Sequence, residues 1–443
     1  MMTRTTFVAL AAVAGACLLA PLTASAQGPG WLEDRSRAQG PGFRLGNFEL
    51  HPGVGLEAGY DSNVFYRDAG SFQPREDSVI FRVSPHVYLT TLSGERLEEG
   101  EGRADDSSRR MFDLEAGVSS EVYFFLSDEV PHNVAVNGHV ELDINPEGRF
   151  GATIFDRLSR TVRPFANRVD SRRINHGMLG NVAGLTLHGR TRGGVVKTSM
   201  GYAMRLAFFE SNDFEYANRF IHQINAETHY RFLPNTSLFW DANADYTTFP
   251  NSGGALTLVD NWQLRTRVGL NGVVTPKLSI TAAVGYMAAF VKDARFSDFD
   301  SVLALVGLKL RLTPTVTLGF GYDRDMQGSV VGLYRVQDRG YMDFQWLLGR
   351  SFLLAASFWA GRLDFGDVVD PAGMSLGGRK DIMVVAQLFG EYRFTDWLAL
   401  NATLGYTGDF TDFEYQTDAG MGPVLEPAGF NKFEAWLGVR VFY

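Results

Sequence analysis

The chain has 443 residues, of which 13% are aromatic and 48 are glycine, and its formal net charge of -9 argues against nucleic-acid binding. After residue 20 no segment approaches the ~18 consecutive apolar residues of a transmembrane helix, and stripes with a helical period are scarce. Composition therefore leaves two classes, a soluble protein or a β-barrel in a membrane.

Residues 1–26 have the features of a secretory signal peptide. Arg4 precedes an apolar run from Phe7 to Ala20, and Ala24, Ser25 and Ala26 supply an A-x-A cleavage site. Cleavage would remove Arg4 and change the formal charge from -9 to about -10. We therefore expect an exported protein.

The single cysteine lies within this apolar run. Cleavage would remove Cys17, so the mature chain would form no disulfide. A lipoprotein anchor at Cys17 is the minor alternative, because Ala14 stands where such signals carry leucine. Beyond the signal, residues 27–50 are predicted to form a periplasmic N-terminal segment and residues 51–443 a transmembrane β-barrel.

The clearest strand pattern runs from Phe112 to Phe124. Its even positions are mostly apolar, whereas Asp113, Glu115 and Glu121 lie among its odd positions. A strand alternates its side chains between two faces, and one of this length crosses a bilayer at a tilt. The segment is therefore predicted to be one strand of a membrane barrel.

The same two-residue period recurs along the chain. Eighteen segments show it, around residues 54–60, 79–89, 112–124, 134–144, 150–164, 178–188, 196–208, 221–232, 238–246, 262–274, 278–286, 302–310, 316–322, 342–346, 352–360, 382–392, 398–406 and 433–443. An even number suits a single-chain bacterial barrel. The predicted fold is all-β, a transmembrane antiparallel outer-membrane β-barrel of about 18 strands, with 16 as the alternative.

Connection lengths support this fold, since such barrels alternate short periplasmic turns with longer outer loops. In the C-terminal half, short links near residues 234, 276, 314, 349 and 395 alternate with the longer connections at 247–260, 291–300, 323–339, 362–380 and 407–431. The N-terminal half is less regular, because the link at 91–109 is long and the one at 128–132 is short. The assignment of strands in the N-terminal half therefore leaves two alternatives, which differ by one pair of strands.

A barrel of this size leaves a wide aqueous bore, so we expect polar side chains on its inner wall. The predicted pore-lining residues are Asp113, Glu115, Glu121, His139, Glu141, Asp143, Glu227, Asp241, Asp245, Arg265, Arg267, Lys309 and Arg311. Acidic and basic sectors of such a wall would set up a field across the pore. The alternative for any single residue is that it faces water only because the lumen is wet.

No catalytic constellation is present in the sequence. His139 and His229 are predicted to face inward on separate strands, and their spacing matches neither a metal motif nor a triad. There is no P-loop, dinucleotide fingerprint or Cys/His cluster. We therefore expect a non-enzyme without cofactor or metal.

Two charged segments are candidates for surface binding. Arginines crowd residues 157–173 and would suit lipopolysaccharide phosphates or an acidic glycan, although a solvated loop explains them equally well. The final outer loop, within residues 409–426, carries five carboxylates that would suit divalent cations or a sugar, although a plain acidic loop is the better explanation.

The chain ends on Tyr443, an aromatic residue on the predicted lipid-facing edge of the last strand. This ending resembles the C-terminal signal by which outer-membrane barrels are recognised for insertion. The resemblance implies contact with the barrel-assembly machinery.

The first hairpin carries a longer motif. The run Gly59, Tyr60, Asp61, Ser62, Asn63, Val64 and Phe65 closes the first strand, and Arg82-Val83-Ser84-Pro85 lies in the second. The run resembles a mark of an outer-membrane β-barrel porin family associated with exopolysaccharide and capsule gene clusters. Independently of the family, Asp61 and Asn63 suit a turn that caps the strand.

This resemblance implies export of a polysaccharide across the bacterial outer membrane in a Wzx/Wzy-type exopolysaccharide or capsule pathway. It implies as partners a periplasmic polysaccharide export protein and an inner-membrane copolymerase, besides outer-membrane lipid and lipopolysaccharide. A general or substrate-specific diffusion porin for small solutes is the first alternative. A structural or adhesive barrel with a plugged pore is the second.

Overall fold

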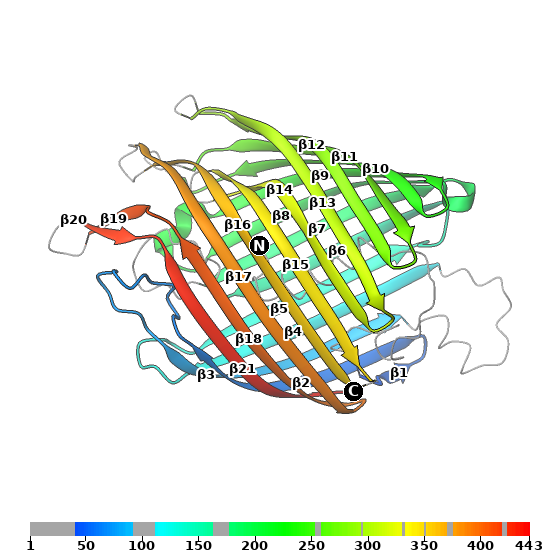
Figure 1. Cartoon of the computed structure of the whole chain (residues 1–443), viewed down its shortest axis with the longest axis horizontal. Helices are drawn as coiled ribbons and strands as arrows, with labels where there is room; N and C mark the ends of the chain where they lie inside the picture. The colour runs from blue at the N-terminus through cyan, green and yellow to red at the C-terminus, as the bar shows by residue number, and fades with distance from the viewer. Residues whose placement is uncertain are drawn as a thin grey trace.

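The computed structural model describes residues 40–91, 111–162, 177–252, 258–293, 296–329, 333–349, 351–369, 375–418 and 423–443, so the predicted signal peptide lies outside the described residues. The main sheet has 19 strands, of which the short β1 (Phe43–Leu45) pairs only with β2 (Phe48–Asp61). The other 18 form a ring, because β21 (Phe430–Phe442) pairs back onto β2 (Figure 1). The predicted barrel of 18 antiparallel strands is confirmed.

Between these ends each strand pairs antiparallel with the next along the chain. The barrel continues through β3 (Ser78–Thr91), β4 (Phe112–Phe125), β5 (Asn133–Ile144), β6 (Phe150–Thr161), β7 (Met178–Arg190), β8 (Val196–Phe209), β9 (Arg219–Leu233), β10 (Thr236–Thr248), β11 (Asn261–Thr275), β12 (Leu278–Val291), β13 (Phe299–Thr313), β14 (Val316–Gly328), β15 (Tyr334–Leu348), β16 (Phe352–Val369), β17 (Ser375–Thr395) and β18 (Leu398–Phe410). A separate hairpin, β19 (Glu414–Asp418) with β20 (Pro423–Pro427), and the short helices η1 (Arg192–Gly194) and η2 (Asn212–Ala217) lie in connections.

The connections divide the barrel into two ends. The turn end holds the start of β2, the end of β21 and the links that precede the even-numbered strands of the ring, which are short from β6 to β18. The loop end holds the links that precede its odd-numbered strands, together with β19 and β20 (Figure 1). The N-terminal half follows the same order, so its register is not displaced. The predicted link at 91–109 lies, after Thr91, outside the described residues.

Strands at the loop end run further than the sequence predicted. Residues 323–339 and 362–380 were expected to be connections, but β14 continues to Gly328 and β16 to Val369. Backbone pairing does not require apolar side chains, and cross-strand ion pairs such as Arg324 with Asp338 (Nη1 to Oδ2, 2.5 Å) fit the ladder beyond the apolar stretch. At the other end, β2 begins at Phe48, ahead of the predicted barrel boundary at residue 51.

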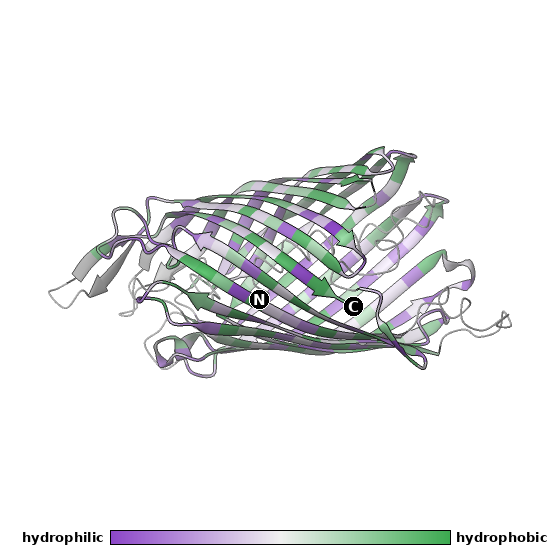
Figure 2. Cartoon of the chain, turned by 90° about the horizontal axis from the view of Figure 1, so that it is seen from below, coloured by the Kyte–Doolittle hydropathy of each residue, from purple (hydrophilic) through white to green (hydrophobic). Residues whose placement is uncertain are grey.

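One face of the barrel wall is apolar and exposed. Val118 is 59% exposed, Val284 62% and Leu437 57%, and their neighbours two positions along each strand share this face. Figure 2 shows the resulting alternation of hydrophobic and hydrophilic residues along the strands. Such a belt of exposed apolar side chains around a closed barrel is stable against lipid and costly against water. We call this face the outer face and the opposite one the inner face.

Within the described ranges, no helix combines the length and the apolar character that crossing a membrane needs.

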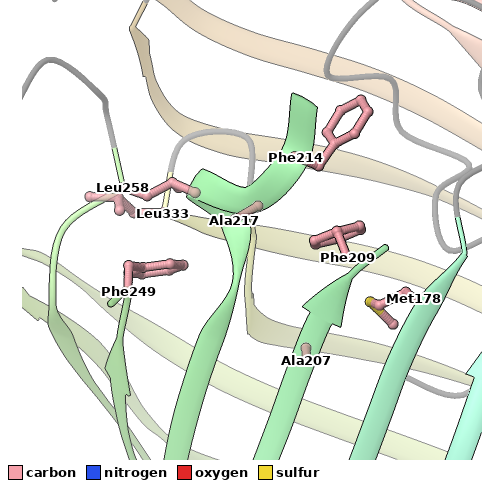
Figure 3. Packing of buried hydrophobic residues seen from close by; sticks show 8 residues of the cluster. All are labelled: Met178, Ala207, Phe209, Phe214, Ala217, Phe249, Leu258 and Leu333. Atoms are coloured by element: carbon pink, nitrogen blue, oxygen red, sulfur yellow. The ribbon is translucent and has the colours of Figure 1, made fainter. Parts of the chain in front are cut away.

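Buried apolar clusters lie at the loop end rather than along the barrel. The largest joins the ends of β7, β8 and β10 with η2 and with Leu333, which lies between β14 and β15 (Figure 3). Its buried members are Met178, Ala207, Phe209, Phe214, Ala217, Phe249, Leu258 and Leu333. Connections from separate parts of the ring therefore pack on one another at this end.

Candidate channel interior

The strand register places all thirteen predicted wall residues on the inner face. On β4 and β5 the ladder partners Glu115 and Glu141 both stand opposite the exposed apolar face. Their side chains are 57% and 34% exposed, so water reaches them from within the ring. The inner-face set is Asp113, Glu115, Glu121, His139, Glu141, Asp143, Glu227, Asp241, Asp245, Arg265, Arg267, Lys309 and Arg311.

Neighbouring strands neutralise several of these charges. Arg267 on β11 lies 2.6 Å (Nε to Oδ2) from Asp241, its ladder partner on β10. Arg265 approaches Asp245 to 3.5 Å (Nη2 to Oδ2). The sequence suggested that these arginines form a basic sector apart from the acids. That expectation was wrong for β11, because cross-strand pairing brings each arginine to a carboxylate.

The two inward histidines are also paired with carboxylates. Nε2 of His139 lies 3.3 Å from Glu115, and Nε2 of His229 lies 2.6 Å from Glu227. The two histidines remain on different strands, β5 and β9. In the part of the chain that the structure describes, no group of three His, Cys, Asp or Glu side chains is placed to hold a metal ion.

Lys309 and Arg311 differ from the other predicted basic residues. They lie two positions apart near the turn end of β13, where their ladder partners on β14 are Gly319 and Thr317. Neither has a carboxylate within ion-pair distance among the described residues. The inner faces that flank them carry Ser279 on β12 and Thr317 on β14. This sector of the wall is therefore positive.

Sequence reasoning missed a dense charged patch beside the junction of the first and last strands. Arg82 lies at its centre, with Nε 2.6 Å from Oε2 of Glu57 and its guanidinium carbon 4.3 Å from the ring centroid of Trp436. Tyr123 lies on another side, at 5.9 Å. Ladder parity alone would have found the group, since Glu57, Arg82 and Tyr123 occupy one row across β2, β3 and β4.

Deeper charges hold the loop end of the same junction. Nζ of Lys432 lies 2.7 Å from Asp61, and both side chains are at most 1% exposed. At the same end of the barrel but on β17, Arg379 and Asp381 form a second pair at 2.6 Å with no exposed surface. Buried ions cost free energy unless they are paired, so these contacts are structural.

The run from Gly59 to Phe65, which carries the family resemblance, forms part of the loop end of this junction. Asp61 accepts a hydrogen bond from the amide of Asn63 (3.0 Å), and the side chain of Asn63 accepts one from the amide of Arg67 (2.8 Å). Val64 and Phe65 are buried against Ile80 in a loop-end cluster. The motif thus forms a capped turn at the junction of β2 and β21, as the turn hypothesis for Asp61 and Asn63 expected.

The β14–β15 hairpin folds inward at the loop end. By strand parity Met326 and Val336 belong to the outer face, yet both are buried with Met287 and Leu303, which belong to the inner faces of β12 and β13. Pairing between β13 and β14 also stops at Arg324, although β14 and β15 stay paired to Gly328. The described loop-end residues of this hairpin around Met326 and Val336, which we call its tip, therefore pack inside the ring.

Contacts made by Arg265 and Leu333 fix this tip to β11 and to the β8–β9 and β10–β11 connections. Nη1 of Arg265 lies 3.5 Å from Oδ2 of Asp325 and 3.4 Å from the carbonyl oxygen of Met326. Beyond the tip, Leu333 enters the cluster that contains Phe214 and Leu258 (Figure 3). The hairpin tip consequently narrows the loop end of the barrel.

Within the described residues, charges from each of the two surface segments have separate partners. Strand parity separates Arg157, which pairs with Glu141 on the inner face, from Arg160, which pairs with Glu210; residues 163–173 lie outside the described residues. In the last loop Asp409 is buried, and Glu426 accepts the amide of Phe72. These two described carboxylates of the final outer loop therefore have separate partners, Arg379 and Phe72.

Tyr443 directly follows the last residue of β21, lies on the side of Val439 and Val441, and is 44% exposed. Its ring stacks on Phe43 of β1 at a centroid distance of 4.1 Å, and its amide donates to the carbonyl of Pro52 (2.8 Å). The C-terminus is thus held at the outer face, as predicted.

No protein-family model and no curated protein matches the chain. Among solved structures, the siderophore receptor PirA from Pseudomonas aeruginosa is similar at a TM-score of 0.43 and 7% identity over 89% of this chain and 80% of that one. The FrpB iron transporter (F3-3 variant) from Neisseria meningitidis gives 0.47 and 10% over 88% and 81%. The outer-membrane protein opdK from P. aeruginosa gives 0.46 and 11% over 89% and 99%.

Proposed function

We propose that this protein is a channel of the bacterial outer membrane that lets hydrophilic solutes cross passively. The observation that carries the proposal is the closed ring of 18 strands with an apolar exposed outer face and a charged inner face that water reaches. Barrels of 16 to 18 strands leave an aqueous channel. Paired charges such as Arg267 with Asp241 keep the wall polar without forming one deep binding site.

Planar bilayer recording of the purified, refolded protein tests this function. Each insertion should produce a discrete step of current, and the size of this step should be proportional to voltage over a moderate range. Folding is checked by heat-modifiable migration in gels. A protein that folds and inserts but carries no ions would contradict a channel and favour the structural barrel.

We further propose that the solute is a polysaccharide on its way out of the cell. The support is the run Gly59–Phe65, which resembles the exopolysaccharide-associated porin family. A polymer needs a wide polar lane with many weak contacts, and the interleaved ion pairs of the inner face would suit such a lane. The diffusion porin for small solutes shares the same lumen and is the competing function.

Gene deletion separates these two functions. Loss of surface glycan with normal growth on small nutrients is the result expected for the polysaccharide channel. Slower uptake of small nutrients with unchanged surface glycan would instead support the diffusion porin. Complementation with a chain that carries a conservative inner-face change, Lys309→Arg, is the matched control.

A further inference from the structure

Three glycines leave part of the inner wall on β13 and β14 without side chains. Gly307 is the ladder partner of Gly321, and Gly319 lies two positions before Gly321 on the same face of β14. Glycines in a strand allow another group to approach the backbone closely. We call these three residues the glycine patch.

The ring of Tyr341 lies across this patch. Tyr341 is the ladder partner of Gly321 from β15. A Cβ atom on Gly321 would lie 2.5 Å from the tyrosine hydroxyl oxygen, and one on Gly307 would lie 3.0 Å from the same atom. The ring therefore extends along the wall toward β13, with one side on the backbone. Because the residue is partly exposed, its other side faces the lumen.

Arg339 lies beside this ring and is already paired. Its guanidinium carbon is 5.8 Å from the ring centroid of Tyr341 and 5.8 Å from that of Trp359. The guanidinium also donates to its ladder partner Asp323, with Nη2 2.6 Å and Nε 2.9 Å from Oδ2. Arg339 therefore positions the Tyr341 ring and contributes no unpaired charge.

Two cations border the other end of the patch. Lys309 lies two positions beyond Gly307 on the inner face of β13, and Arg311 lies two positions further. Neither has a carboxylate within ion-pair distance among the described residues. Neighbouring positions on one face of a strand are about 7 Å apart. A ring that stacks on Tyr341 would therefore be within reach of the long, flexible Lys309 side chain.

These groups match the chemistry of an acidic sugar. One face of a pyranose ring consists of C–H bonds, which pack on the electron-rich face of an aromatic ring. A uronic acid adds a carboxylate at the edge of that ring, and lysine and arginine bind carboxylates by charge-assisted hydrogen bonds. Asp343, which is exposed beside Gly319, can accept hydrogen bonds from sugar hydroxyls. It lies two strands from Lys309, about 10 Å by strand spacing.

We propose that Tyr341, Lys309 and Arg311 form a subsite for an acidic saccharide, in which a uronic acid ring stacks on Tyr341 and its carboxylate binds one of the two cations. The inference rests on the proposed polysaccharide channel and adds the chemical class of the polymer. One exposed ring and one or two ion contacts bind weakly, so a polymer leaves the subsite again and moves on.

Block of the channel current by three probes tests the subsite. Trigalacturonate carries sugar rings and carboxylates, maltotriose carries the rings alone, and tricarballylate carries the carboxylates without a ring. In the wild-type channel trigalacturonate should reach half-block at a concentration roughly threefold or more below that of either other probe. Equal half-blocking concentrations for trigalacturonate and either of the other probes would overturn the proposal without the need for a variant.

Variants separate the ring contact from the charge contact. Tyr341→Leu should raise the half-blocking concentration of both sugars by roughly twofold to tenfold and leave that of tricarballylate unchanged. Lys309→Gln with Arg311→Gln should remove the preference for trigalacturonate over maltotriose. A preference that survives this double change in a conducting channel would contradict the subsite.

Phe155 on the inner face of β6 supplies the matched control. Its ring also leans over a glycine, with Cζ 2.6 Å from the position of a Cβ atom on Gly184. The neighbouring Arg157 is paired with Glu141 at 2.6 Å. Phe155→Leu should therefore leave the preference for trigalacturonate over maltotriose unchanged.

The outcomes distinguish the subsite from the functions on which it rests. Equal block by trigalacturonate and maltotriose would overturn the subsite and leave the channel intact. The expected preference, combined with unchanged surface glycan after gene deletion, would support the subsite and remove polysaccharide export. Absence of conductance in folded wild-type protein would remove the channel and the subsite together.

Discussion

Two glycines on the inner face of β2 have different surroundings. A Cβ atom on Gly59 would lie 2.3 Å from Cε3 of Trp436, its ladder partner on β21. A Cβ atom on Gly55 would lie no closer than 3.6 Å to its nearest neighbour, Ser84. Of these two positions, only Gly59 therefore requires the absence of a side chain.

Gly59→Ala should lower the free energy of unfolding by ~1 to 3 kcal/mol, because the indole ring has to move out of its packed position. Urea unfolding of the refolded protein in detergent, followed by tryptophan fluorescence, measures this loss. Gly55→Ala is the matched control and should stay within ~0.5 kcal/mol of wild type. Equal effects of the two changes would refute the role of close packing at the closure.

The buried Lys432–Asp61 pair gives a second residue-level prediction. Lys432→Met removes the ammonium group 2.7 Å from the Asp61 carboxylate in a site that is at most 1% exposed. Loss of one partner of a buried pair costs ~3 to 5 kcal/mol, and adding Asp61→Asn should recover part of it. Arg362→Gln, in a pair whose arginine is 53% exposed, should cost less than ~1 kcal/mol. Similar losses for the buried and the exposed pair would contradict this assignment.

Single residues could be assigned to a face from the sequence but not to a partner. Period-two alternation fixed the side of the wall on which Asp241 and Arg267 lie. Their mutual contact depends on the register between β10 and β11, which only the ladder defines. The same holds for Lys432 and Asp61, which are brought together by closure of the barrel.

At the scale of elements, the inward tip of the β14–β15 hairpin could not be predicted from the sequence. The alternation of side chains places Met326 on the outer face. This residue would face outward if β14 stayed in the barrel wall along its whole length. The hairpin leaves β13 after Arg324 and packs its outer face on the inner faces of β12 and β13. A change of path of this kind does not alter the period of the side chains, so periodicity cannot detect it.

Leu333→Asp should loosen this inward tip, because a carboxylate would be buried among Phe214, Leu258 and the other apolar members of the loop-end cluster. Single-channel recording should then show larger or noisier conductance steps than wild type. Leu425→Asp is the control, since this residue of β20 is 63% exposed. Conductance unchanged by Leu333→Asp in a folded barrel would mean that the tip does not restrict the path.

At the scale of the whole molecule, the number and order of the strands could be predicted from the sequence because two independent patterns give the same result. Side chains alternate every second residue, and connections alternate between short and long. The first pattern follows from a wall with lipid on one side and water on the other, and the second from short turns at one end of the barrel and longer loops at the other. The distribution of charge within the lumen was less accessible, because it depends on which inward residues pair and which stay unpaired. For this reason only the structure distinguishes Lys309 and Arg311, which have no carboxylate partner among the described residues, from Arg265 and Arg267, which are paired.

Cysteine accessibility tests the central claim, a water-filled lumen inside a lipid-facing wall. Glu115 and Val118 lie on opposite faces of β4. Cys17 is the only native cysteine, so single cysteines at these two positions can be introduced into a Cys17→Ser background. In lipid vesicles a charged, water-soluble thiol reagent should modify Glu115→Cys quickly and leave Val118→Cys unmodified. Modification of Val118→Cys with protection of Glu115→Cys would contradict the account.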